Sequence, residues 1–168
     1  DLYVENTSLN DTLIAMLRDQ RERSVLADLA EDAGEPAITI TDGPIELWRA
    51  TELAGVYKNQ FDLYIDALNK LHAVGATTAG YVDKPRSDLV VRMLEIAQLD
   101  DGQLDEAGKE RPFAGVRDTD LFTDLLQPGQ RSAVFGIQSR SARDYSDDLA
   151  LHLFYLNVSE IKGRPWIT

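Results

Sequence analysis

The sequence predicts an α/β fold, in which a mixed parallel and antiparallel sheet is flanked by helices in layers. Segments whose apolar residues recur every three or four positions alternate with short β-branched runs. A helix separates the two early strands, which favours parallel pairing, whereas the last two strands follow each other and favour antiparallel pairing. Apolar residues make up 43% of the 168 residues, enough for a sizeable core. We therefore expect one domain over residues 1–168.

The first half of the chain predicts two helices and two strands. A helix begins at Asn10 or Asp11 and ends before Gly34, with its apolar residues in two groups that leave room for a bend at 18–24. Residues 37–41 form a buried strand. Pro44 suits the first turn of a second helix, which runs to Gly75, and residues 77–82 form the next strand.

The second half predicts shorter elements around an irregular segment. Ser87 can cap a third helix, and Asp118 or Thr119 a fourth. Between these helices, residues 100–117 are acidic and aperiodic, which is typical of an exposed loop or insertion. Residues 132–138 and 149–158 form the two late strands.

The composition excludes several classes of function. The chain has no cysteine, so disulfides, thiolate zinc sites and a thiol nucleophile are excluded. Its net charge of −12, from 29 acidic and 17 basic residues, repels nucleic acid unless a basic patch or a bound cation compensates. No apolar run approaches the ~20 residues of a membrane span, so we expect a cytoplasmic protein without a membrane partner. No P-loop, dinucleotide-binding or histidine-based zinc motif is present.

Asp42 is the first candidate site residue. It follows a predicted strand and precedes Gly43, at the carboxyl end where open α/β sheets bind ligands. A carboxylate there could hold a divalent cation. The alternative is an Asp-Gly pair that only forms a turn.

Glu22 is the second candidate. With positions 25, 26 and 29 it follows helical spacing, so it continues the stripe expected to pack on the sheet. A glutamate on an inward helix face needs a partner or a metal. The alternative is an exposed acid, reached if the helix bends near 18–24.

Basic residues supply the third set of candidates. Lys84 and Arg86 lie in the turn after the second strand, and two cations beside a metal site suit a phosphodiester backbone. The alternative is that they form salt bridges with nearby acids. Arg131 opens a late strand, where it could be a structural clamp or a phosphate contact.

Short motifs then follow one another in an order that resembles the NurA-type nuclease domain, from about Glu22 to the end of the chain. After Glu22, the motifs are ITITDGP (38–44), VDKPRS (82–87), DLF (120–122), LQPGQRS (126–132), LFYLNV (153–158) and RPW (164–166). The resemblance implies an RNase H-like core whose acids bind Mn²⁺ or Mg²⁺ and which cleaves DNA in end processing and repair, as a 5′–3′ exonuclease or an endonuclease. It also implies work with a hexameric HerA-type ATPase, and leaves a homodimer open. Glu22 and Asp42 match two of the metal-binding, catalytic acids, and Lys84 matches a basic residue.

Two features of that family are missing from the sequence. An Asp-Gly motif on a first core strand should precede Glu22, and a region that supplies a histidine should follow Trp166. We therefore expect a fragment of a longer protein, which alone has little or no nuclease activity because two acids hold a metal weakly. The alternative reading is a non-catalytic acidic α/β module that docks onto a partner such as an ATPase.

Overall fold

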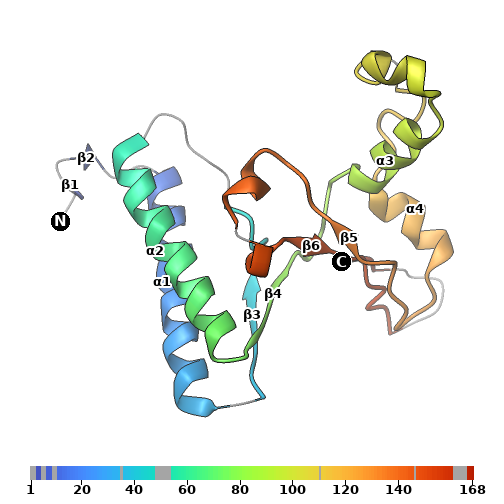
Figure 1. Ribbon diagram of the computed structural model, residues 1–168. Coiled ribbons are helices and arrows are strands. Elements are labelled where there is room, and N and C mark those ends of the chain that lie inside the picture. The colour runs from blue at the N-terminus through green and yellow to red at the C-terminus, as the bar shows by residue number, and fades with distance from the viewer. Residues whose placement is uncertain are drawn as a thin grey trace. The chain divides into compact units, whose positions relative to one another are not determined.

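Contacts divide the chain into two units, each built from separate stretches of sequence. The computed structural model describes residues 3–4, 7–8, 11–34, 36–47, 54–109, 111–145, 147–160 and 166–168. Unit 1 comprises residues 1–81 and 136–152, and unit 2 comprises residues 82–135 and 153–168. Helices alternate with parallel and antiparallel strand pairs (Figure 1), which confirms the predicted α/β class. The described strands form three separate pairs rather than one continuous sheet. That all of the chain forms a single domain stays a prediction.

Unit 1 begins with an antiparallel pair that the sequence pattern did not predict. Strand β1 (Tyr3–Val4) pairs with β2 (Thr7–Ser8). Helix α1 (Asp11–Ala33) follows and is helical throughout, including residues 18–24, where the sequence left room for a bend. It ends before Gly34, whose φ of +73° is the left-handed conformation common after helices.

The buried stripe of α1 differs from the prediction by one position. The inward side chains recur at three-, four- and seven-residue steps and are Leu13, Met16, Arg23, Ala27 and Ala30. One of them, Arg23, is charged. Glu22, expected on this stripe, is only half-buried, because neighbouring helix positions point about 100° apart. The residue that faces the interior is therefore Arg23, which is 2% exposed.

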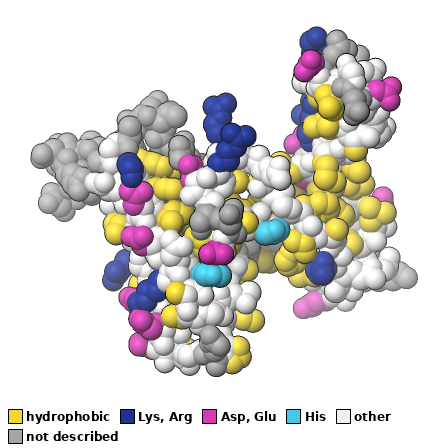
Figure 2. Space-filling view, viewed as in Figure 1, with side chains coloured by type: hydrophobic (Ala, Val, Ile, Leu, Met, Phe, Trp, Pro, Cys, Tyr) yellow, Lys and Arg dark blue, Asp and Glu magenta, His cyan; other side chains and the backbone are white. Residues whose placement is uncertain are grey.

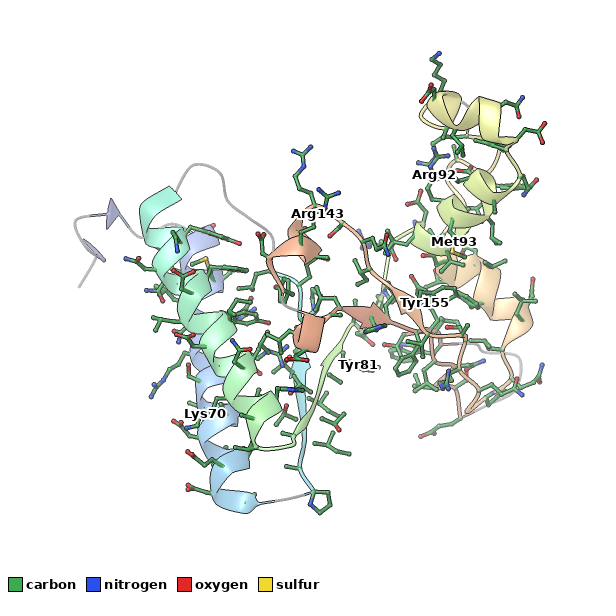
Figure 3. All side chains as sticks on the ribbon, in the orientation of Figure 1. Lys70, Tyr81, Arg92, Met93, Arg143 and Tyr155 are labelled. Carbon is green, nitrogen blue, oxygen red and sulfur yellow. The ribbon has the colours of Figure 1, made fainter. Side chains whose placement is uncertain are left out.

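A parallel β-α-β unit forms the centre of unit 1. Strand β3 (Ile38–Asp42), helix α2 (Ala54–Ala73) and strand β4 (Thr77–Tyr81) follow in sequence, and the two strands pair in register from Ile38 with Thr77 to Asp42 with Tyr81. The predicted parallel pairing is thus confirmed. Helix α2 lies beside α1 (Figure 1), and Lys70, labelled in Figure 3, forms ion pairs with Asp28 at 2.9 Å and Glu31 at 2.7 Å on α1.

The β3 strand is buried on one face only, which corrects the expectation of a fully buried strand. Thr39 and Thr41 are buried, and the Thr39 hydroxyl lies 3.1 Å from that of Thr78 on β4. Ile38 and Ile40 point the other way and are 72% and 63% exposed. Successive residues of a strand face opposite sides, and α1 and α2 contact the pair without covering the side of the isoleucines.

The segment after β3 is not helical, so the predicted start of the second helix at Pro44 is wrong. Its backbone groups form hydrogen bonds with tyrosine hydroxyls instead. The hydroxyls of Tyr64 and Tyr145 donate to the Ile45 carbonyl at 2.6 and 3.2 Å, and the Leu47 N–H donates to the Tyr145 hydroxyl at 2.9 Å. Residues 48–53, which the prediction placed in the helix, lie outside the described residues.

The core of unit 1 lies between α1, α2 and the return segment of residues 136–152. That segment holds two short 3₁₀ helices, η3 (Ser141–Asp144) and η4 (Asp147–Leu149). Aromatic rings join the parts: Phe61 stacks on Tyr57 with 6.0 Å between ring centroids and meets Tyr145 edge-on at 6.0 Å. The apolar stripe predicted for the second helix is confirmed from residue 57 onward, and its buried members are Tyr57, Phe61, Tyr64, Ala67, Leu68 and Leu71.

Unit 2 contains two helices and a set of antiparallel segments. Helix α3 (Leu89–Ala97) is followed by a 3₁₀ helix, η2 (Asp101–Glu106), and by helix α4 (Asp118–Leu125). Apart from η2, the described residues of 100–117 are turns and irregular backbone and are largely exposed, in line with the predicted loop. Strands β5 (Phe135–Gly136) and β6 (His152–Leu153) pair with each other at the boundaries of the two units. In the described part of the chain, no helix is long and apolar enough to cross a membrane.

A buried carboxylate organises the core of unit 2. Asp118 is 0% exposed and accepts hydrogen bonds from the Val91 N–H at 2.8 Å and from the Tyr155 hydroxyl at 2.7 Å. The Val91 N–H is one of the free donors in the first turn of α3, so Asp118 caps that helix from another element. Ser87, predicted to cap α3, instead lies 2.8 Å from the Tyr155 hydroxyl. Tyr155, labelled in Figure 3, stacks on Phe122 at 4.8 Å.

A second buried acid ties α3 to the segment before α4. Glu95 accepts hydrogen bonds from Arg92 at 2.8 Å, the Phe113 N–H at 2.9 Å and Arg111 at 3.2 Å. Chiefly because of the Arg92 hydrogen bond, and despite the opposing effect of burial, the pKa of Glu95 lies below its ordinary value. Arg92 is labelled in Figure 3.

Candidate functional site

Asp42 ends β3 at the carboxyl edge of the parallel pair, as the sequence predicted. It pairs with Tyr81 of β4, and its side chain is exposed. By strand alternation it belongs to the face of Ile40 rather than to the buried face of Thr41. The side chain of Asp42 is therefore accessible to solvent and to a ligand.

The turn that follows Asp42 is held tightly against β4. The Gly43 N–H donates to the Tyr81 carbonyl at 2.7 Å, and the φ of Gly43 is +96°, a region that L side chains rarely adopt. Gly80 makes room for this turn, since a Cβ there would lie 2.9 Å from the Ile45 nitrogen and closer still to the Gly43 carbonyl oxygen. The two glycines thus fix where the strand ends and where Asp42 stands.

Glu22 lies on α1, one helical turn after Arg18, whose hydrogen-bond partner is the neighbouring Asp19. Nε and Nη2 of Arg18 donate to Oδ1 of Asp19 at 3.1 and 3.0 Å, and this hydrogen bond is the largest reason why the pKa of Arg18 is raised. The charges of Glu22 and Asp42 act on Arg18 in the same direction. Asp42 faces the side of β3 that α1 leaves uncovered, whereas Glu22 lies on α1, so the structure does not bring the two predicted acids together on one face of the strand pair.

One buried cation, Arg23, lies on the inner side of α1. The Arg23 guanidinium carbon is 6.0 Å from the centroid of the Tyr64 ring, and its Nη1 has no hydrogen-bond partner among the described residues. Burial raises the pKa of Tyr64, Arg23 opposes this effect, and Asp19 and Glu22 add to it. Arg23 rather than Glu22 is therefore the charged residue of α1 that meets the interior of unit 1.

The donor set of Glu22 and Asp42 fits a hard divalent cation. Both offer carboxylate oxygens, one half-buried and one exposed. Mg²⁺ is commonly bound through one or two carboxylates, with waters and substrate phosphates in the other positions, and Mn²⁺ accepts similar ligands. Among the described residues, no three carboxylate or imidazole side chains gather into a metal-binding group.

Glu46 is a further acid near the end of β3, which no motif in the sequence singles out. Its Oε1 accepts hydrogen bonds from the hydroxyls of Ser139 at 2.7 Å and Ser141 at 2.5 Å. An acid four positions after Asp42 is visible in the sequence. The serines lie more than ninety positions away along the chain, so only the fold reveals that this carboxylate is held in place.

The predicted basic residues all belong to unit 2. Lys84 is exposed, its Nζ lies 3.8 Å from Oδ2 of Asp83, and it stands 5.7 Å from the centroid of the Trp166 ring. Arg86 is also exposed. The salt bridge that was the alternative reading for this turn exists for Lys84, but it is long and exposed, and such pairs contribute little.

Arg131 is tied to its own strand, and a phosphate contact stays a prediction. Its backbone forms an antiparallel bridge with Leu156, and its Nη1 donates to the Ser132 carbonyl at 2.8 Å. The guanidinium carbon lies 6.0 Å from the centroid of the Phe154 ring, and the residue is exposed. The side chain is held beside the strand and still reaches solvent.

Comparison with protein families matches residues 4–168 of this chain to the NurA domain. No curated protein sequence and no solved structure matches the chain. The match covers almost the whole sequence, including both predicted acids and all three predicted basic residues. The chain therefore belongs to the NurA family, which indicates a nuclease-type function.

Proposed function

We propose that this chain is a divalent-metal-dependent DNA nuclease domain, which hydrolyses phosphodiester bonds in DNA end processing and repair. Its membership of the NurA family supports the reaction type. The single observation that supports the site is that Asp42 is exposed at the carboxyl end of β3, directly before the turn at Gly43. That edge of an α/β sheet is where ligands bind.

Glu22 and Asp42 are the proposed metal-binding and catalytic acids. Bound Mn²⁺ or Mg²⁺ supplies an activated water and stabilises the charge that develops on the phosphate. Residues of the chain itself position the proposed metal-binding site. The turn at Gly43, whose N–H donates to the Tyr81 carbonyl, holds the end of β3 that carries Asp42.

The basic residues of unit 2 are the proposed contacts to the DNA backbone. Lys84, Arg86 and Arg131 are exposed cations on a chain whose net charge is −12. Guanidinium and ammonium groups are the usual partners of phosphate oxygens, and such contacts position DNA without reading its sequence. We further propose a cytoplasmic location and a HerA-type hexameric ATPase as partner.

A metal-binding measurement on the purified chain tests the site directly. We expect Mn²⁺ binding, followed by electron paramagnetic resonance, to weaken roughly tenfold or more in Asp42→Asn and in Glu22→Gln, since each removes one charged ligand. Asp66→Asn is the matched control, because Asp66 is an exposed carboxylate on α2. Equal Mn²⁺ affinity in all four proteins would refute the assignment of the two acids.

Cleavage of labelled DNA in the presence of Mn²⁺ tests the reaction. We expect little or no product from this chain alone, since two carboxylates hold a metal weakly, and more product from a longer chain that supplies additional ligands. Activity of the longer chain should disappear in Asp42→Asn and persist in Asp66→Asn. A longer chain that binds Mn²⁺ and DNA but never cleaves would contradict the proposed reaction.

A second candidate function is a non-catalytic module that docks onto a partner such as an ATPase. The exposed Ile38 and Ile40 favour it, because parallel strands normally have both faces covered. Under this reading, Ile40→Lys abolishes complex formation with the ATPase, and Asp42→Asn has no effect on any activity of that complex. Loss of nuclease activity in Asp42→Asn, with the complex intact, would support the nuclease over the docking module.

A further inference from the structure

Three segments of unit 2 form a small antiparallel ladder. Residues 130–133 lie beside residues 154–158, which in turn lie beside residues 166–168. The bridges are Arg131 with Leu156 and Asn157 with Ile167. Backbone hydrogen bonds continue the ladder, among them Ser132 N–H to the Tyr155 carbonyl at 2.8 Å and Leu156 N–H to the Thr168 carbonyl at 2.9 Å.

The two faces of this ladder differ sharply. One face is buried and consists of Ser132, Tyr155, Asn157 and Ile167. By strand alternation, the other face carries the residues between them. Phe154 and Trp166 are on that outer face and are each 49% exposed. Hydrophobic side chains gather on the visible surface of unit 2 (Figure 2). We call the outer face of these three segments the stacking face.

Each exposed ring on the stacking face has a cation beside it. Arg131 lies 6.0 Å from the centroid of Phe154, and Lys84 lies 5.7 Å from the centroid of Trp166. These distances are within the range of cation–π attraction. Both cations are among the residues proposed to contact phosphates. Each of the two rings therefore has a proposed phosphate-binding side chain beside it.

The Trp166 ring is fixed in orientation. Its Nε1 donates to the Asp83 carbonyl at 3.2 Å, and the neighbouring Thr168 hydroxyl donates to the Val82 carbonyl at 2.5 Å. A ring held by its N–H group, with about half of its surface open, loses little conformational entropy when a flat ligand stacks on it.

We propose that the stacking face binds an unpaired strand of DNA, with bases stacked on Phe154 and Trp166 and phosphates on Arg131 and Lys84. Exposed aromatic rings beside cations are the features that bind single strands without reading sequence, because every base has a π-face. Phe154 lies four residues along its strand from Val158, which is beside Trp166. The rings are therefore about 13 Å apart along the strand, a span of several nucleotides.

Charge favours DNA over a protein as the occupant. The chain carries a net charge of −12, yet Lys84 and Arg131 lie next to the two rings of the stacking face, with Asp83 3.8 Å from Lys84. A duplex fits less well, since its bases are stacked on one another and do not present their faces. This inference rests on the proposed function, because the proposed function supplies DNA as the ligand.

Binding of labelled oligonucleotides, measured by fluorescence anisotropy in EDTA so that no cleavage occurs, tests the proposal. We expect the chain to bind an unpaired strand about tenfold or more tightly than a duplex of the same length. Trp166→Ala and Phe154→Ala should each weaken single-strand binding about tenfold, with little change for duplex. Trp166→Phe, which keeps a ring, should restore most of the affinity.

Phe113→Ala is the matched control, because Phe113 is an exposed aromatic residue of unit 2 outside the ladder, and it should bind as the unmodified chain does. Equal binding of single strand and duplex, with no effect of the aromatic variants, would overturn the stacking face and leave the proposed nuclease standing. Absence of any DNA binding would overturn both. Loss of ATPase association in Trp166→Ala, without loss of single-strand binding, would make this face a protein-docking surface and overturn the inference.

Discussion

Removing the buried carboxylate of Asp118 should destabilise unit 2 and leave unit 1 unchanged. Asp118→Ala deletes the acceptor of the Val91 N–H at the start of α3 and of the Tyr155 hydroxyl. Loss of a helix cap costs about 1 kcal/mol. A hydroxyl that loses a charged partner in the interior adds about 1.5–3 kcal/mol. The expected loss in the free energy of unfolding is therefore about 2.5–4 kcal/mol.

Amide hydrogen exchange measured by mass spectrometry distinguishes the two units. For amides of unit 2 that exchange by opening of the whole unit, about 2.5–4 kcal/mol corresponds to exchange faster by about two to three powers of ten. Peptides from α1 and α2 should exchange as before. Tyr155→Phe keeps the ring stacked on Phe122 but removes the hydroxyl, so it should cost about 1–2 kcal/mol. If Asp118→Ala left the exchange of α3 unchanged, or accelerated both units equally, the role given to this carboxylate would be wrong.

Three further predictions concern other parts of the chain. The pKa of Glu95 is depressed in the folded chain, so on acidification the unfolded chain takes up this proton first. The stability that this residue contributes should be present at neutral pH and lost as the pH falls through about 4 and below. Glu95→Gln should flatten that part of an acid-denaturation curve. Gly80→Ala should destabilise unit 1 by about 1–3 kcal/mol in thermal unfolding, because its Cβ meets backbone atoms that cannot move aside, whereas Gly55→Ala, with open space around it, should be neutral or stabilising. Arg131→Gln and Lys84→Gln should each reduce the slope of log affinity against log salt for single-stranded DNA by about 0.7; an unchanged slope would remove that residue from the phosphate contacts.

The sequence predicted those parts of the fold that depend on local pattern. The positions of β3 and β4, their parallel pairing and the inward side of α2 all follow from periodicity and turn residues near them. The placement of Asp42 at the end of its strand also follows, because Gly43 and Pro44 mark that end in the sequence.

Other features depend on contacts between distant residues and could not be predicted. Arg23 rather than Glu22 is the inward residue of α1, and its guanidinium lies over the ring of Tyr64. Tyr64 lies forty-one positions later in the sequence. Likewise, Pro44 does not start a helix, since two tyrosines from other elements bind the Ile45 carbonyl. Local signals favoured a helix at that point, and tertiary hydrogen bonds outweighed them.

The division of the chain into interleaved stretches has a practical consequence for dissecting the protein. Residues 136–152 return to the first unit after the second has begun, and residues 153–168 return to the second. A truncation after residue 81 would remove Tyr145 and Leu151 from one hydrophobic core, and a fragment of residues 82–135 would lack Tyr155 and Ile167 of the other. Functions should therefore be separated by point substitutions in the full chain, or by grafting the returning segments onto their own unit with a short linker, rather than by cutting the gene in two.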